Sequence, residues 1–260
     1  MREGAVDAAQ DIAHRSVGRG YHLAALQEQL QPDHRGIYQA MAGRRAGWSA
    51  AQIANRLPPV AARYEAWWRH RLLGAVAGRP FPLAEELAWL AHATHAGPGR
   101  LVIDVACSEG LYGRFLAAKG AEVWLVDHSP AFLRRALRRC REEGLRELVD
   151  VVAAPAQALP FVDACADAVV MGGSLNEIGD APAAVAEMVR VLRPGGRLCL
   201  MSLLPATSRR GRLLQQLLRP GGVVLYGRAE TIAMLGGSMR LVEETTDGLV
   251  FRLVAERRAR

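Results

Sequence analysis

The sequence is poor in the residues that build disulfide frameworks and zinc sites. Its 260 residues include four cysteines, no two of which form a Cys-x-x-Cys pair: Cys107, Cys140, Cys165 and Cys199. Widely spaced single cysteines predict neither a disulfide framework nor a bound metal. Long apolar runs are missing too, since none approaches the roughly 20 residues that cross a bilayer, and the N-terminus lacks the apolar stretch of a signal peptide. We therefore expect a cytoplasmic protein with no metal and no membrane span.

Lysine is almost absent, although the chain is basic. The net charge is +7, but only one of the 33 basic residues is a lysine, Lys119. So strong a preference for arginine more often reflects GC-rich coding bias than a nucleic-acid surface, and exposed helix faces explain the local arginine pairs equally well. Nucleic acid is thus not the expected partner.

A strand, a tight turn, a helix and a second strand follow one another between Leu101 and Asp127. Residues 101–106 form a short apolar run that includes Asp104, a helical pattern comes next, and the apolar run 123–126 leads directly into Asp127. Two parallel strands joined through a helix have their ligand crevice over the carboxyl ends of the strands. Each of these two strands brings a carboxylate to that crevice.

Strands and helices continue to alternate, with short links, from Arg100 onward. This alternation predicts an α/β fold, in which a Rossmann-like, doubly wound, mainly parallel sheet of seven strands ends in an antiparallel hairpin. The further elements that we expect are a helix from Pro130, a strand over 148–153, a strand over 168–171, a helix after Asp180, a strand over 197–203, helices over 210–218 and 229–235, and hairpin strands over 240–244 and 249–255.

The chain before the sheet divides into two parts. Residues 1–35 show little periodicity and predict a mobile or weakly helical leader, whereas residues 36–96 have a helical pattern that starts at Ile37 and predict a helical appendage or lid. The stretch 48–57 has the texture of a helix-turn-helix element, which would suit DNA. A pair of prolines interrupts it before a three-helix unit is complete, so we favour the lid.

The turn after the first strand decides which nucleotide the crevice can hold. A dinucleotide site needs Gly-x-Gly-x-x-Gly and a P-loop needs Gly-x-x-x-x-Gly-Lys-Ser/Thr, but this turn keeps only Gly110. The crevice instead offers Asp104 and Asp127. An acid that ends the second strand suits a ribose diol, and a second acid suits a cationic group. S-adenosylmethionine has a ribose, an ammonium, a sulfonium and no phosphate, so it fits this set better than a nicotinamide cofactor does.

From Arg100 to Ala255 the chain resembles the class I S-adenosylmethionine-dependent methyltransferases, in the small-molecule branch that includes quinone-biosynthesis methyltransferases. The resemblance implies S-adenosyl-L-methionine as cofactor and a methyltransferase domain over residues 97–260. Four segments carry it, in this order and at this spacing: residues 102–110 (Val-Ile-Asp-Val-Ala-Cys-Ser-Glu-Gly) at the family's Asp-x-Gly-x-Gly-x-Gly loop, Val126-Asp127 at its ribose position, Ala158-Leu159-Pro160-Phe161 after the third strand, and residues 191–196 (Val-Leu-Arg-Pro-Gly-Gly) before the fifth.

The same resemblance implies which residues contact the cofactor. Ala106 and Ser108 replace two glycines of the family's loop, and Ser108 will be strained if its position needs a positive φ. Pro155 stands where many relatives have an aspartate that accepts a hydrogen bond from adenine. Apolar side chains, backbone atoms and Gln157 are therefore expected to contact the adenine, and His128 is expected to lie beside it. The full set of expected contacts is Asp104, Ala106, Ser108, Gly110, Asp127, His128, Pro155, Ala156, Gln157 and Gly173.

Residues beyond the fourth strand usually face the methyl group in this fold, and here they include Asn176 and Glu177. We take Glu177 as the candidate base or acceptor-orienting group and Asn176 as its hydrogen-bonding neighbour. A plain loop toward Asp180 is the alternative. The family's Asn-Pro-Pro-Tyr motif for planar amino groups and its Pro-Cys nucleophile are both missing at this strand end.

These features predict O- or C-methylation of a small, largely apolar acceptor. Two alternatives stay open: a nucleic-acid-directed methyltransferase that uses the stretch 48–57, and a non-catalytic cofactor-binding or interaction protein.

Overall fold

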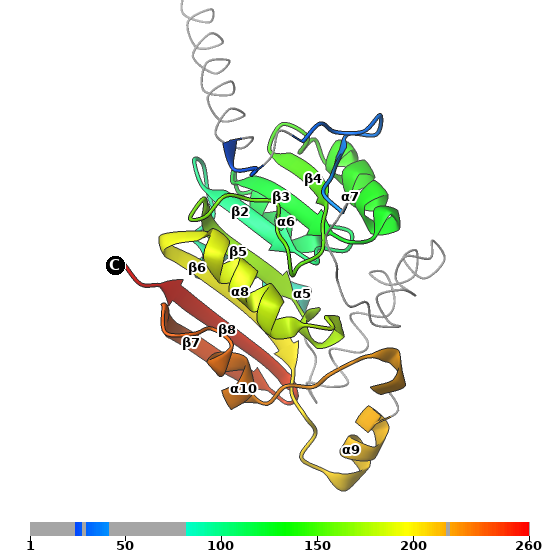
Figure 1. The fold of residues 1–260 in the computed structure, drawn as a ribbon, viewed down its shortest axis with the longest axis vertical. Coiled ribbons are helices and arrows are strands. Elements are labelled where there is room, and N and C mark those ends of the chain that lie inside the picture. Colours follow the sequence, from blue (N-terminus) through cyan, green and yellow to red (C-terminus); the bar gives the residue numbers. More distant parts are fainter. Residues whose placement is uncertain (1–23, 28–29, 42–81, 217–218, 260) are drawn as a thin grey trace, which may run out of the picture.

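A single sheet of eight strands, in the order β1-β4-β3-β2-β5-β6-β8-β7, forms the centre of the protein. The computed structural model describes residues 24–27, 30–41, 82–216 and 219–259 (Figure 1). The strands are β1 (Ile37–Gln39), β2 (Leu101–Val105), β3 (Glu122–Asp127), β4 (Val149–Ala153), β5 (Ala166–Gly172), β6 (Leu192–Leu203), β7 (Met239–Asp247) and β8 (Val250–Arg257). The helices are α5 (Leu83–Thr94), α6 (Leu111–Ala117), α7 (Pro130–Glu142), α8 (Ala181–Val191), α9 (Arg209–Gln216) and α10 (Arg228–Ala233), with 3₁₀ turns η2 (Leu175–Glu177) and η3 (Arg219–Gly221).

The sheet is parallel except at one edge. Strands β1 to β6 pair in parallel, whereas β8 pairs antiparallel with both β6 and β7. The predicted Rossmann-like sheet with its closing antiparallel hairpin is therefore confirmed. The chain runs outward in one direction from β2 through β3 to β4 and in the other from β5 to β6. The carboxyl ends of β2 and β5 thus lie at the switch point, where open α/β sheets bind their ligands.

The expectation that a helical pattern begins at Ile37 is wrong. Residues 37–39 form β1, which adds an eighth strand to the seven expected and pairs with β4 in the register Ile37 to Val151. The ring of Tyr38 packs edge-on against Trp124, with 5.1 Å between ring centroids. This burial against β3 and β4 outweighs the local pattern, because strand preference depends mainly on the neighbours that a strand meets.

Other parts of the N-terminal prediction fall largely outside the described residues, among them the stretch 48–57. Within the expected leader, residues 24–27 lie against the 160–162 segment, where Gln27 N donates to Pro160 O at 2.9 Å. Near the end of the expected helical appendage, residues 83–94 do form a helix, α5.

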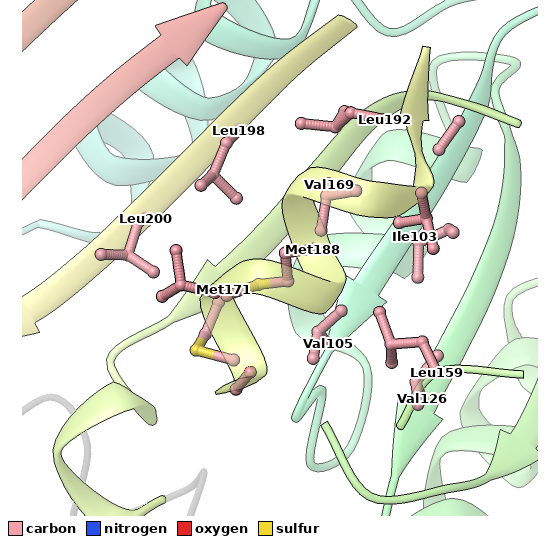
Figure 2. Packing of buried hydrophobic residues seen from close by; sticks show 14 of the residues in the cluster. Ile103, Val105, Val126, Leu159, Val169, Met171, Met188, Leu192, Leu198 and Leu200 are labelled. Atoms are coloured by element: carbon pink, nitrogen blue, oxygen red, sulfur yellow. The ribbon is translucent and has the colours of Figure 1, made fainter. Parts of the chain in front are cut away.

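Apolar side chains alternate between the two faces of the strands and make two layers of core. Helix α8 covers one face, and α5, α6 and α7 cover the other. Figure 2 shows the first layer, in which Met188 of α8 points at side chains from β2, β5 and β6, among them Ile103, Val105, Val169, Met171, Leu198 and Leu200. In the described part of the chain, no helix has the length and hydropathy that crossing a bilayer requires.

Candidate functional site

The loop between β2 and α6 keeps a glycine-type backbone without its glycines. Ala106, Ser108 and Gly110 have φ values of 54°, 53° and 75°, all in the left-handed region. Two non-glycine residues there cost roughly 1 kcal/mol each. The strain expected at Ser108 is therefore present, and Ala106 shares it. Hydrogen bonds hold the loop in place, since Cys107 N donates to Val126 O at 3.0 Å and Ser108 N donates to Asp127 Oδ2 at 2.9 Å.

Helix α6 leaves the loop in very close contact with the sheet. A Cβ on Gly113 would lie 2.3 Å from Leu125 Cδ2, and one on Gly110 would lie 2.6 Å from Leu125 Cδ1. Asp104 Oδ2 accepts a hydrogen bond from Gly113 N at 2.8 Å. Asp104 thus anchors the first turn of α6 from beneath the loop. Its expected contact with a cofactor stays a prediction.

Asp127 ends β3 beside this loop, with 4% of its surface exposed. Its Oδ1 accepts from Ser129 N at 2.8 Å, its Oδ2 accepts from Ser108 N, and His128 Nδ1 lies 3.4 Å from Oδ1. Burial raises the pKa of Asp127, while His128 and the backbone N–H groups oppose the increase. A carboxylate has about four lone-pair sites, so each oxygen retains capacity for another donor. Such a group is suited to a pair of hydroxyls.

A pair of ionic contacts fastens the loop to α7. Glu109 is buried and pairs with Arg135, while Arg139 Nε lies 3.9 Å from its other carboxylate oxygen. Arg114 of α6 donates to Glu109 O at 3.1 Å and pairs with Glu143 after α7. Sequence reasoning missed these contacts because it assigned the arginine pairs of α7 to an exposed face. The signal was an acid inside the loop followed by arginines four residues apart.

The segment that follows β4 closes the next side of the site. Ala154 N donates to Asp127 O at 3.1 Å, and Ala158 N donates to Pro155 O at 3.1 Å, so residues 154–158 turn back beside Asp127. Pro155 is buried, and Ala156 and Gln157 are half-buried. The amide Nε2 of Gln157 is buried, and no described residue gives it a hydrogen-bond partner. A buried polar atom without a partner is unfavourable unless a ligand or water satisfies it.

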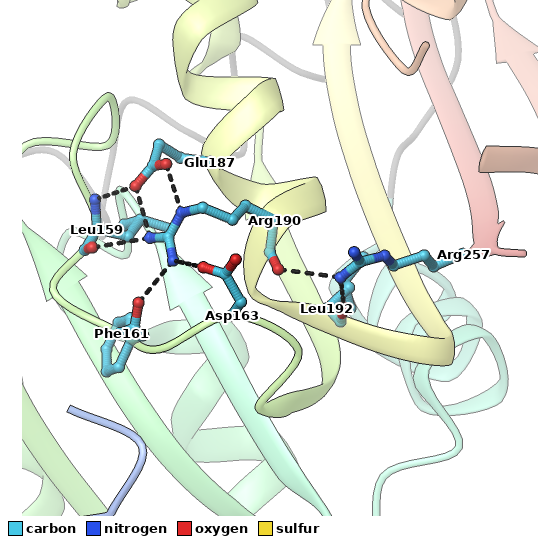
Figure 3. Close-up of polar contacts among 7 residues, drawn as sticks. All are labelled: Leu159, Phe161, Asp163, Glu187, Arg190, Leu192 and Arg257. Atoms are coloured by element: carbon cyan, nitrogen blue, oxygen red, sulfur yellow. Dashed lines mark hydrogen bonds and ion pairs between the residues drawn. The ribbon is translucent and has the colours of Figure 1, made fainter. Parts of the chain in front are cut away.

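Arg190 of α8 holds the far end of this segment (Figure 3). Its guanidinium donates to Phe161 O at 2.7 Å and to Leu159 O at 3.1 Å, and it pairs with Asp163 and Glu187. Glu187 Oε2 in turn accepts from Leu159 N at 2.8 Å. The Leu159-Pro160-Phe161 element that sequence analysis singled out is therefore fixed by a network that the sequence did not reveal.

The carboxyl end of β5 meets the loop from the opposite side. Gly173 has a φ of 86°, and Ser174 Oγ donates to Ala106 O at 3.4 Å. A Cβ on Gly172 would lie 2.8 Å from the Tyr112 ring. The Tyr112 hydroxyl donates to the carboxylate of Glu86, which is buried in the first turn of α5. Neither residue was expected from the sequence, since a lone acid in an amphipathic helix carries no sign of its partner.

Asn176 is committed to backbone contacts. Its Nδ2 donates to Leu203 O at 3.1 Å and to Val224 O at 2.9 Å, and its Oδ1 accepts from Leu203 N at 2.7 Å. These bonds pin η2 to the end of β6 and favour a positioning role over contact with an acceptor. Glu177 is half-buried in the same turn. The catalytic roles expected for both residues stay predictions.

The cysteines show no feature of a reactive or metal-binding site. All four are free, and burial raises the pKa of Cys107 well above its ordinary value, with Asp104 and Asp127 adding to the increase. A thiol with a raised pKa is a poor nucleophile. Among the residues that the structure describes, no three His, Cys, Asp or Glu side chains are placed to hold a metal ion.

Residues 103–200 match a protein family described as a methyltransferase domain. A demethylmenaquinone methyltransferase from Renibacterium salmoninarum is 38% identical over 106 residues, which are 41% of this chain and 42% of that protein. The match thus spans less than half the length of this relative.

Solved structures show the same architecture. The cyclase SpnF superposes with a TM-score of 0.64 at 18% identity, over 84% of this chain and 99% of SpnF. A phosphoethanolamine N-methyltransferase 2 from Haemonchus contortus, solved with phosphomonomethylethanolamine and S-adenosylhomocysteine, has a TM-score of 0.64 at 14% identity, over 81% of this chain and 59% of that one. At such identities the likeness concerns the fold alone.

Proposed function

We infer that this chain, whose residues 103–200 match the methyltransferase-domain family, transfers a methyl group from S-adenosyl-L-methionine to a small molecule. The observation that carries this inference is Asp127, a buried carboxylate at the end of β3 that is held against a loop of left-handed residues. A buried carboxylate beside such a loop suits a ligand that has a ribose diol and carries no phosphate. The family match over the same residues supports the same reading.

The residues around Asp127 fit the cofactor. Asp127 would accept the ribose hydroxyls, and the loop 106–110 would lie along the methionine part. The unpartnered amide of Gln157 would meet the adenine edge, which offers both ring-nitrogen acceptors and an amino donor. Pro155 and Ala156 supply apolar contact in place of the aspartate that many relatives have. When bound, S-adenosylmethionine supplies an electrophilic methyl group on a sulfonium.

The chain's own contribution to the reaction is mainly alignment. The loop 106–110 and the turn at Gly173 are joined by the Ser174 bond to Ala106 O, and this junction would fix the direction from which an acceptor approaches. Alignment of reacting atoms in a desolvated site can supply much of the rate enhancement. We propose Glu177 as the group that orients the acceptor or accepts its proton, and Asn176 as the residue that positions η2.

For the acceptor we propose a small, largely apolar molecule methylated on oxygen or carbon. The Renibacterium relative is named for demethylmenaquinone, and a quinone-like acceptor agrees with the lack of the Asn-Pro-Pro-Tyr and Pro-Cys motifs. We propose that the protein works in the cytoplasm, where its four free cysteines would stay reduced.

Calorimetric titration with S-adenosylmethionine tests the cofactor assignment. We expect the unchanged protein to bind the cofactor. Asp127→Ala should bind it 10- to 100-fold more weakly, because a hydrogen bond to a charged group is worth about 1.5–3 kcal/mol. Gln157→Ala should lose less affinity. Gln216→Ala is the control, since Gln216 is an exposed glutamine on α9. Absence of heat from a folded sample would remove the assignment. Binding without S-adenosylhomocysteine formation in the presence of a short-chain demethylmenaquinol would favour the non-catalytic alternative.

A further inference from the structure

The segment between β6 and α10, residues 204–227, carries charge of one sign only. No aspartate or glutamate occurs between Glu187 and Glu230, and the segment contains four arginines: Arg209, Arg210, Arg212 and Arg219. All four are exposed. This is a local excess of positive charge.

These arginines differ from those packed on the sheet. Arg190 pairs with Glu187, and Arg135 pairs with Glu109. By contrast, none of the four arginines in residues 204–227 forms an ion pair with any residue that the structure describes, and Arg212 uses its guanidinium for a bond of 2.6 Å to Thr207 O. Their charge therefore remains available to a partner.

Apolar side chains accompany this charge. In the described part of the chain three large apolar side chains are exposed, and two of them lie in this segment: Leu213 at 64% and Val224 at 43%. A short stretch that is both basic and apolar is typical of segments that lie in a membrane interface.

The segment projects from the edge of the sheet where the site lies. It leaves the carboxyl end of β6, and α9 stands clear of the sheet beyond that strand (Figure 1). Its return is fixed beside η2, because Val224 N donates to Asn176 O at 2.8 Å and Asn176 Nδ2 donates to Val224 O. Gln215 closes the segment on itself through bonds to Ala206 N at 2.7 Å and Leu204 O at 3.1 Å. The unit is thus held together and attached next to the proposed acceptor turn.

We propose that residues 204–227 dock on an anionic lipid surface. The four arginines meet the headgroup phosphates, and Leu213 and Val224 enter the boundary between headgroups and acyl chains. A nucleic acid would engage the arginines but would gain little from exposed Leu213 and Val224. Docking in this way turns the edge of the sheet that bears the site toward the bilayer, from which an apolar acceptor could reach it without crossing water. The proposal concerns lipid binding and does not require that methyl transfer be correct.

Co-sedimentation of the full chain with vesicles tests the proposal. One vesicle contains phosphatidylglycerol and phosphatidylcholine, the other phosphatidylcholine alone. We expect the protein to bind the anionic vesicles. Its affinity should fall strongly between about 50 and 500 mM salt, because salt screens the attraction between the arginines and the headgroup phosphates. Arg209→Gln/Arg210→Gln/Arg212→Gln should weaken it tenfold or more, and Leu213→Ser severalfold. The control triple Arg134→Gln/Arg138→Gln/Arg141→Gln removes equal charge from the exposed face of α7 and should change binding less than twofold.

Three results would overturn the proposal. The first is equal affinity for both kinds of vesicle. The second is an equal loss of binding in the two triple variants, since this would trace binding to net charge. The third is salt-dependent binding to a DNA duplex with no effect of Leu213→Ser on vesicle binding, which would mark a nucleic-acid surface. Circular dichroism shows whether each variant is folded, and the readout is independent of cofactor binding and turnover.

Discussion

Asp127 combines two requirements that oppose each other. Burial favours its protonated form and raises its pKa, whereas a ribose diol needs its charged form as acceptor. Because the folded-state pKa lies above the unfolded value, the associated stabilisation is present below the unfolded pKa and is lost as the pH rises through the folded pKa. The ligand-free protein therefore bears a cost for this charge at neutral pH, and bound hydroxyls would offset it.

This opposition predicts how cofactor affinity changes with pH. The affinity for S-adenosylmethionine should rise as the pH increases from about 4, the ordinary aspartate pKa, through the raised pKa of Asp127, and should then level off. Calorimetry at closely spaced pH values between 4.5 and 8 measures the change. Asp127→Asn should bind more weakly and lose the rise. A rise that persists in Asp127→Asn would show that Asp127 is not the source of the pH effect.

At the level of single residues, the sequence predicted positions better than partners. It placed Asp127 and Ser108 in one site, and the structure joins them by a hydrogen bond. It did not predict the pair of Glu86 with Tyr112 or that of Glu109 with Arg135. Both pairs join residues 26 positions apart on different elements, so they depend on how helices settle on the sheet and leave no local periodic signal.

Helix α6 shows how closely an element is fitted to the sheet. Gly113→Ala would place a Cβ 2.3 Å from Leu125 Cδ2 and 2.9 Å from Val123 Cγ1. Alanine is the better helix former by about 1 kcal/mol, so in a loosely packed helix this change would stabilise the protein. We expect the opposite, a loss of about 2 kcal/mol in the free energy of unfolding, because overpacking forces both side chains to move. Urea unfolding measures it.

Gly97→Ala is the matched control, because a Cβ at that position has no atom within 4 Å. Its free energy of unfolding should stay within about 0.5 kcal/mol of the original. If Gly113→Ala proved as stable as the original chain, α6 would not pack as closely on β3 as the Gly113 to Leu125 distance indicates.

Elements with a strong local pattern were predictable, and the exception is informative. The strands and helices after Leu101 follow the expected order because each has its own periodicity and end signals, such as Ser129 before Pro130 at the start of α7. Strand β1 has three residues, too few for a period. It forms a strand because it pairs with the edge of β4, and the local sequence carries no sign of this pairing.

For the whole molecule, Arg190 is the residue that joins distant parts of the chain. From α8 it reaches the Leu159 and Phe161 carbonyls before β5, and its own carbonyl accepts from Arg257 near the C-terminus at 3.0 Å (Figure 3). Residues 159–161, which Arg190 fixes, follow shortly after residues 155–157, which line the site. Stability and cofactor affinity should therefore be coupled through this side chain.

Arg190→Gln should lower the free energy of unfolding by about 2–3 kcal/mol, because it removes the cation that pairs with Glu187 and the donor of two backbone carbonyls. Arg190→Lys should recover little of this loss, since an ammonium cannot reproduce a guanidinium that bridges four partners. Arg240→Gln, which breaks an exposed pair with Glu256, should cost less than about 1 kcal/mol. Urea unfolding and calorimetry with S-adenosylmethionine, measured on the same samples, check the coupling. If Arg190→Gln destabilised the fold but left the cofactor affinity unchanged, the wall from Pro155 to Gln157 would be held independently of α8.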